Sequence, residues 1–216
     1  MTNDELQLSV ADELFWDPKV DSEAIAVSAN DGTVTLRGTV GSFRQKREAK
    51  KAAERVYGVV AVDNELEVRI LNEQRRDDAD LRGDVLQALL LDSLVPSSVD
   101  ATVKDGFVTL TGSVDWQYQR AEAAFVAGNI LGVVGVENDI FLESPAPWPA
   151  DVENSIQKAL ERDAKLDANS IQVKTANGTA TLTGNVRSWA EHDAAVTAAW
   201  AAPGVTDVND RLTVFY

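Results

Sequence analysis

The stretch Asp31-Gly-Thr-Val-Thr-Leu-Arg-Gly-Thr-Val40 decides the fold of this chain, because it occurs three times. It returns as Asp105-Gly-Phe-Val-Thr-Leu-Thr-Gly-Ser-Val114 and as Asn177-Gly-Thr-Ala-Thr-Leu-Thr-Gly-Asn-Val186, at offsets of 74 and then 72 residues. A second block keeps the same offsets over residues 58–66, 132–140 and 204–212. Two blocks that share one spacing indicate internal repeats. We therefore predict three modules of about 70 residues each, covering residues 1–71, 78–143 and 149–216.

Each module has the same predicted order of elements. Apolar residues four positions apart, such as Leu6, Val10 and Leu14, predict a first helix. A short strand follows, and then an Asp-Gly or Asn-Gly pair that is typical of a two-residue hairpin turn. A second strand leads into a longer helix, expected at about residues 42–57, 116–131 and 188–202. A glycine ends that helix and a third strand completes the module.

The connections between these elements predict the topology of the sheet. A hairpin makes the first two strands antiparallel, and a helical crossover returns the third strand parallel to the second. We therefore expect an α+β fold of three tandem αββαβ modules, each with a small mixed three-stranded sheet and two helices packed on one face. Gly38 interrupts the alternation of the second strand, which predicts either a bulge or a close approach of backbone.

The glycine-rich second strand, the helix after it and the Gly-Val ending resemble the BON domain family, named for bacterial osmotically inducible and nodulation proteins. All three modules carry these marks, although the third has Ala180 in place of valine. The resemblance implies the αββαβ fold. It also implies a family linked to envelope stress, to phospholipid or ligand binding, and to chaperone-like or adaptor roles.

Composition narrows the possible partners. The 216 residues include 20 Lys and Arg against 35 Asp and Glu, for a net charge of −15. This argues against a nucleic-acid partner, which needs a basic surface. No apolar stretch approaches the roughly 20 residues of a transmembrane segment. The N-terminus lacks a secretory pattern, so we expect a cytoplasmic protein, or a periplasmic one if a signal sequence had been removed.

The sequence offers no recognisable catalytic or metal site. There is no cysteine and a single histidine, His192, which excludes thiolate and multi-histidine metal sites. Helix neighbours such as His192 and Asp193 do not point at one site, so we interpret the histidine as a surface residue. No phosphate loop or dinucleotide fingerprint is present. We expect a non-enzymatic protein without a cofactor.

The second helix of module one has a cationic stripe, which we define as Arg44, Arg47, Lys51 and Arg55. Their spacing of three and four residues places them on one side of the helix. One interpretation is a site for phospholipid headgroups or an acidic protein partner. The other is a helix face that simply contacts water.

The same positions in module two are largely apolar, with Tyr118, Ala121 and Phe125 among them. Because the opposite side of this helix must pack on its own sheet, we predict that this face docks on another module or a second copy of the chain. If it stayed exposed, it would mark a partner or lipid site. We add Trp200 as a further interface candidate, since it lies off the apolar stripe of the third helix. Trp148 lies in a proline-rich stretch, 145–149, that predicts a stiff linker packed against the neighbouring modules.

These features favour a stress-related binding or adaptor protein that engages a protein, a phospholipid or a small ligand. The alternative is a structural, self-assembling protein in which the helix face of module two mediates module packing or oligomerisation.

Overall fold

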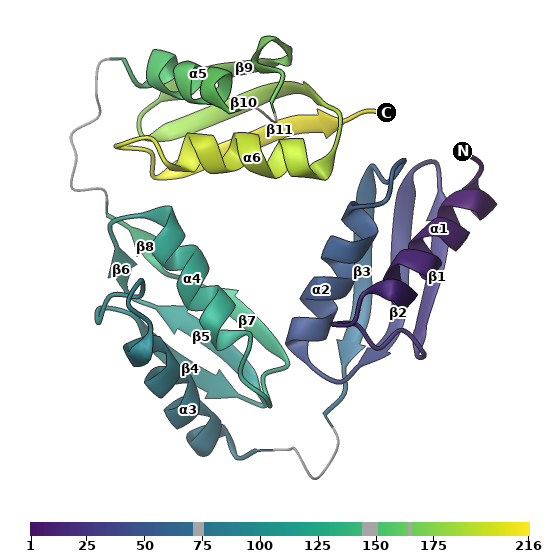
Figure 1. The fold of residues 1–216 in the computed structure, drawn as a ribbon. Coiled ribbons are helices and arrows are strands. Elements are labelled where there is room, and N and C mark those ends of the chain that lie inside the picture. The colour runs from purple at the N-terminus through teal and green to yellow at the C-terminus, as the bar shows by residue number, and fades with distance from the viewer. Residues whose placement is uncertain (71–75, 144–150, 164–165) are drawn as a thin grey trace. The chain divides into compact units, whose positions relative to one another are not determined.

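The computed structural model describes residues 1–70, 76–143, 151–163 and 166–216, so the predicted linker at 145–149 lies outside the described residues (Figure 1). The chain divides into two compact units, one of residues 1–114 and 118–141, the other of residues 115–117 and 142–216. The predicted α+β class is confirmed, with small mixed sheets and helices in each module. Within the described ranges, no helix is long and apolar enough to cross a membrane.

Module one shows the repeated arrangement most fully. It consists of α1 (Asn3–Trp16), β1 (Ile25–Asn30), β2 (Thr33–Val40), α2 (Phe43–Glu54) and β3 (Ala61–Val68). The central strand β2 runs antiparallel to β1 and parallel to β3, as the connections predict. Both helices pack on one face of the sheet (Figure 1), where a buried core forms. That core includes Leu6, Val10, Leu14, Val34, Leu36, Ala49, Ala52 and Ala53.

Modules two and three repeat this order. Module two has α3 (Asp78–Leu91), β4 (Asp100–Lys104), β5 (Phe107–Thr111), β6 (Ser113–Val114), α4 (Gln117–Ala127), β7 (Gly135–Asn138) and β8 (Phe141–Leu142). Module three has α5 (Val152–Arg162), the 3-10 helix η2 (Ala168–Ser170), β9 (Ile171–Ala176), β10 (Thr179–Val186), α6 (Trp189–Trp200) and β11 (Asp207–Val214). In module two the sheet is divided, and β6 pairs with β8 separately from β4, β5 and β7.

The hairpin turn also positions the third strand. Asp31 and Gly32 have φ values of 48° and 80°, and positive φ at both central residues is the signature of the turn that matches the twist of a hairpin. The Gly32 carbonyl then accepts a hydrogen bond from the Val60 amide at 2.8 Å, immediately before β3. The amides of Val134 and Thr206 bond in the same way to the carbonyls of Gly106 and Gly178. One turn therefore fixes both the hairpin and the start of the parallel strand.

Gly38 marks a close approach of backbone and not a bulge. Strand β2 pairs with β3 without interruption across this position, and with β1 up to it. Gly38 has φ 126°, and a Cβ there would overlap the carbonyl oxygen of Ala24. The next amide, of Thr39, donates to that same oxygen at 3.2 Å. Of the two sequence-based alternatives, the structure supports the second.

The second helices are shorter than their sequence patterns suggest. Helix α2 ends at Glu54 instead of residue 57, and α4 ends at Ala127 instead of residue 131. After Glu54, the amides of Arg55 and Val56 bond three residues back, which tightens the last turn beyond α-helical geometry. At the other end, Ser42 lies outside the helix and its hydroxyl accepts from the Gln45 amide, as an N-cap does.

One side chain in module one ties the third strand to the second helix. The Asn64 amide group donates to the backbone carbonyl of Lys46 at 2.7 Å, and its oxygen accepts from the Leu66 amide at 3.3 Å. In module two, Asn138 makes the equivalent bond to the Arg120 carbonyl at 2.8 Å.

Module three makes the same connection with different chemistry. Asp210 stands at the position of Asn64, and an ionised carboxylate cannot donate to a carbonyl. Its oxygen instead lies 2.7 Å from Nε2 of His192, which occupies the position of Lys46. The tie between strand and helix is thus kept by a pair of side chains.

We predict that Asn64→Asp lowers the free energy of unfolding by about 1–3 kcal/mol, because the Lys46 carbonyl loses its donor. Adding Lys46→His should recover part of that loss by transplanting the pair of module three. Urea unfolding of the two variants and the wild-type chain measures both effects. Equal midpoints for Asn64→Asp and wild type would show that the tie contributes nothing.

Candidate functional site

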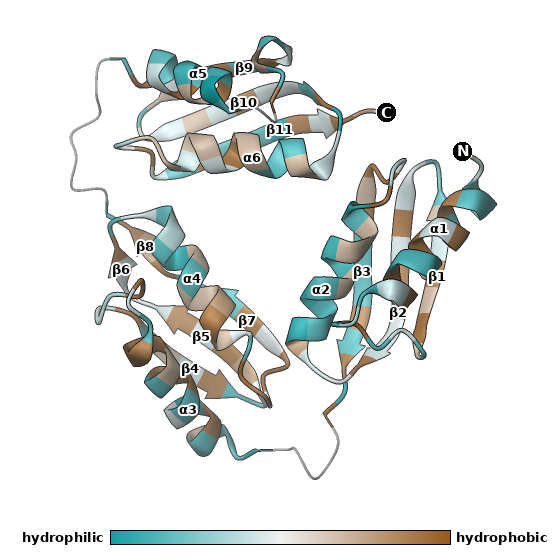
Figure 2. Ribbon diagram, in the orientation of Figure 1, coloured by the Kyte–Doolittle hydropathy of each residue, from teal (hydrophilic) through white to brown (hydrophobic). Residues whose placement is uncertain are grey.

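Packing of α2 on its sheet places the cationic stripe on the outside of module one. The alanines at positions 49, 52 and 53 are fully buried, so the opposite side of the helix faces outward. Figure 2 shows α2 as a largely hydrophilic helix. The four stripe residues, however, have different surroundings.

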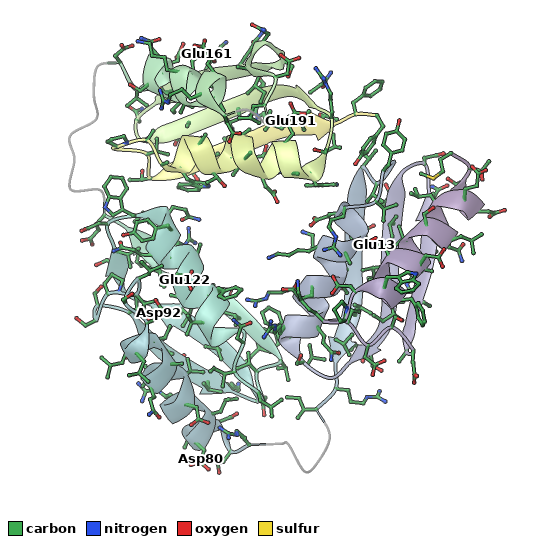
Figure 3. The ribbon with its side chains drawn as sticks, viewed as in Figure 1. Glu13, Asp80, Asp92, Glu122, Glu161 and Glu191 are labelled. Atoms are coloured by element: carbon green, nitrogen blue, oxygen red, sulfur yellow. The ribbon has the colours of Figure 1, made fainter. Side chains whose placement is uncertain are left out.

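Arg55 forms ion pairs inside module one. Its guanidinium contacts the carboxylates of Glu13 and Asp17 at 2.8 Å each, and Figure 3 labels Glu13. Asp17 is a buried residue, with 7% of its surface exposed. The hydrogen bond from Arg55 lowers the pKa of Asp17 most, and the hydrogen bond from the Lys19 amide lowers it further. Arg55 therefore joins the ends of α1 and α2, which is a structural role.

Arg47 contacts module two. Its Nη2 donates to Oδ1 of Asn129 at 2.7 Å, and its Nη1 lies 3.5 Å from the carbonyl oxygens of Ala124 and Phe125. The guanidinium also lies over two aromatic rings, at 5.6 Å from the centre of Phe43 and 5.0 Å from that of Phe125. Loss of solvent around the guanidinium lowers the pKa of Arg47. We call this contact the Arg47 clamp.

Arg44 and Lys51 remain exposed to solvent. In the part of the chain that the structure describes, neither side chain forms a hydrogen bond or an ion pair. They are seven residues apart, which places them about 10 Å apart along the helix and within about 20° around it. These two residues are the cations of the stripe that are available to a ligand.

The candidate interface residues of module two lie on the outer side of α4. Tyr118 and Phe125 have 54% and 44% of their surface exposed, and Ala121 is exposed as well. The Arg47 clamp thus covers Phe125 only in part. Trp200 differs, because it is half-buried and packs against the core of module three.

His192 contacts two carboxylates. Its Nδ1 lies 3.1 Å from Asp193 and its Nε2 lies 2.7 Å from Asp210, while the Trp189 ring packs against the imidazole. The sequence interpretation of a surface histidine that shares no site with Asp193 is therefore wrong, because only 14% of the His192 side chain is exposed and Asp193 contacts it. It also missed Asp210, which lies on β11. Within the described ranges, no three histidine, aspartate or glutamate side chains are grouped so that they could hold a metal ion.

The positions of α4 that match the stripe include Asn129, but the sequence analysis paired neither Asn129 nor Gly128 with Arg47. Both follow the last residue of α4, and a Cβ on Gly128 would lie 2.8 Å from Nη1 of Arg47. A glycine near the end of a helix is usually interpreted as a helix terminator. A glycine at residue 128, four residues before the Gly132 that the sequence predicts as the helix end, was the available signal of a close contact.

Comparison with known proteins gives a family match over most of the chain. The profile of the BON domain matches residues 2–70, 77–143 and 150–214. The osmotically-inducible protein Y of Escherichia coli strain K12 is 36% identical over 126 residues, which are 56% of this chain and 63% of that protein. The match therefore spans less than two thirds of that relative's length.

Two solved structures of CdsD, described as a structural protein of the type III secretion system of Chlamydia trachomatis, are 16% identical to this chain. One match covers 98% of this chain and 92% of the other, and the second, to a C-terminal domain, covers both chains completely. The TM-score is 0.27 in each case, which is too low to support a shared arrangement.

The pKa of Asp17 predicts how stability depends on pH in module one. Because folding lowers this pKa below its usual value of 3.8, the ion pair with Arg55 stabilises the fold fully above that value and is lost as the pH falls below it. Asp17→Asn should therefore reduce the loss of stability that the protein shows on acidification. Urea unfolding midpoints measured between neutral pH and about pH 3 check this.

The matched control is Asp92→Asn, at the equivalent place after α3. Asp92 accepts a hydrogen bond from the Leu94 amide as Asp17 does from Lys19, but in the described residues it has no arginine partner. An equal reduction of that loss in both variants would contradict the role assigned to the Asp17–Arg55 pair.

Proposed function

We propose that this chain, which belongs to the BON domain family, is a non-catalytic binding or adaptor protein that holds an anionic partner on α2 of module one. The similarity to an osmotically-inducible protein supports a stress-related role. The observation that carries the proposal is the pair Arg44 and Lys51, which is exposed and forms no ion pair in the described structure.

The distance between the two cations favours a particular kind of partner. Residues about 10 Å apart on one helix face can contact two groups on a surface with extended side chains, whereas both must bend toward each other to share a single small anion. A phospholipid surface or an acidic protein has such groups. The net charge of −15 repels anions from the rest of the molecule, so this binding should be local and sensitive to salt.

We expect Arg44→Glu with Lys51→Glu to weaken binding to phosphatidylglycerol vesicles about ten-fold or more, because each basic residue contributes about 1 kcal/mol at an anionic surface. Sedimentation with the vesicles measures the binding, and phosphatidylcholine vesicles give the uncharged reference. Capture by an immobilised acidic protein, with the same variant, tests the protein partner.

The control variant is Lys104→Glu with Lys174→Glu. It changes the net charge equally, but its two lysines are exposed residues of β4 and β9 and do not belong to α2. Equal binding by the wild-type chain and the stripe variant, or an equal loss in the control, would remove the stripe from consideration.

The second candidate function is self-assembly through α4. The observation in its favour is that Tyr118 and Phe125 leave an aromatic surface open to solvent, and aromatic residues are enriched in interfaces between proteins. In this case the occupant of the α4 face is a second copy of the chain.

Self-assembly predicts a mass well above the 23.3 kDa of one chain by light scattering, and a shift toward the single chain in Phe125→Asp. Leu131→Asp is the control, because Leu131 is 47% exposed in the same module but lies beyond the end of α4. A wild-type mass of one chain at all concentrations would exclude this candidate.

A further inference from the structure

We propose that the Arg47 clamp is a latch between modules one and two, and that a phosphate-bearing anionic ligand on the cationic stripe opens it. In the closed state Arg47 is held by α4. In the open state Arg47 joins Arg44 and Lys51 on the ligand, and Phe125 is uncovered. The ligand part of this inference rests on the proposed function.

In the closed state Arg47 places a positive charge at the C-terminal end of α4. The last carbonyls of a helix lack partners within the helix and carry a partial negative charge, so they favour a nearby cation. Helix α4 has no basic residue in its last turn, whereas α2 has Lys51 in its own. Arg47 supplies the cation from module one, near the carbonyl of Phe125 and that of Ala124, although the latter also accepts from the Gly128 amide at 3.0 Å.

The fit of this contact is specific to module two. A Cβ on Gly128 would approach Nη1 of Arg47 to 2.8 Å and the Phe43 ring to 3.0 Å, so a side chain there would displace the guanidinium from the end of α4. The equivalent positions are Glu54 in module one and Trp200 in module three. Of the three second helices, the one in module two has a glycine at the place where Arg47 reaches its end.

The closed contact is also replaceable, because all of its acceptors are neutral. Arg47 bonds to an amide oxygen and to carbonyl oxygens, and it stacks on aromatic rings. A phosphate adds a full negative charge opposite the guanidinium and can accept two of its hydrogen bonds at once, which the neutral acceptors of the clamp do not offer. A phosphate on the stripe therefore competes well for Arg47.

The position of the ligand makes this competition direct. Arg44 and Lys51 are three residues before and four residues after Arg47, so all three side chains are neighbours on the helix surface. In the closed state the loss of solvent lowers the pKa of Arg47, while Glu48 raises it and Arg44 lowers it. An anion on the stripe offsets the charge of Arg44.

Coupling of this kind is reciprocal, which gives a test on module two alone. Gly128→Val should open the latch without changing the stripe, and should tighten binding to phosphatidylglycerol vesicles about five-fold or more. Gly83→Val is the matched control, because a Cβ on Gly83 in α3 has no heavy atom within 4 Å. Asn129→Ala, which removes the 2.7 Å acceptor of Arg47, is the second variant if Gly128→Val does not fold.

The opening itself can be followed by energy transfer between fluorophores. The chain has no cysteine, so Ser28→Cys and Lys104→Cys, at exposed positions of β1 and β4, place one label in each module. We expect Gly128→Val to change the transfer without ligand. Phosphatidylglycerol vesicles should cause the same change in wild type, and the Arg44→Glu, Lys51→Glu variant should not respond. Inorganic phosphate replaces the vesicles in a parallel titration, which distinguishes free phosphate from a lipid surface as the source.

Two results overturn the inference in different ways. The latch is refuted if wild type binds vesicles or phosphate while the energy transfer stays constant. It is also refuted if Gly128→Val changes neither the energy transfer nor the affinity. In both cases the proposed function stands. If no variant binds either probe while Gly128→Val still changes the transfer, the proposed function and the ligand-driven opening are both wrong, and the closed contact alone is retained.

Discussion

The positive φ angles of the two-residue turn are the constraint on which each module depends. In module one they set the register of β1 against β2, and they aim the Gly32 carbonyl at the start of β3. The same turn reaches the first helix, since the Asp31 amide donates to Asn3 at 3.0 Å. In module two, Asp78 at the start of α3 accepts from both turn amides. A single local conformation thus connects the hairpin, the parallel strand and the first helix.

The sequence predicts the parts of this fold that depend on neighbouring residues. The turn, the strands and the apolar stripe of α1 are encoded within a few positions, so they can be recognised without the structure. The ends of α2 and α4 were placed too late, because a tightened last turn has the same composition as a helix. The choice at Gly38 was left open, because its cause is the carbonyl of Ala24, which lies on the preceding segment.

The stripe shows why the candidate site could be predicted only in part. Helical periodicity correctly groups Arg44, Arg47, Lys51 and Arg55 on one side of α2. It contains no information on what approaches that side from elsewhere in the chain. Asp17 pairs with Arg55 across 38 positions, and Asn129 bonds to Arg47 across 82. Such contacts depend on how elements pack, so of the four cations only two remain open.

The tie between the third strand and the second helix has a wider consequence. The chain contains three versions of this tie at equivalent positions. Two of them use an asparagine side chain, Asn64 or Asn138, and the third uses the pair of Asp210 and His192. The fold therefore requires a hydrogen-bonded connection between the third strand and the second helix at this position, and different pairs of groups can make it. Residues at equivalent positions of the three modules can therefore be exchanged for one another. Such exchanges distinguish the interactions that the αββαβ fold requires from those that are specific to one module.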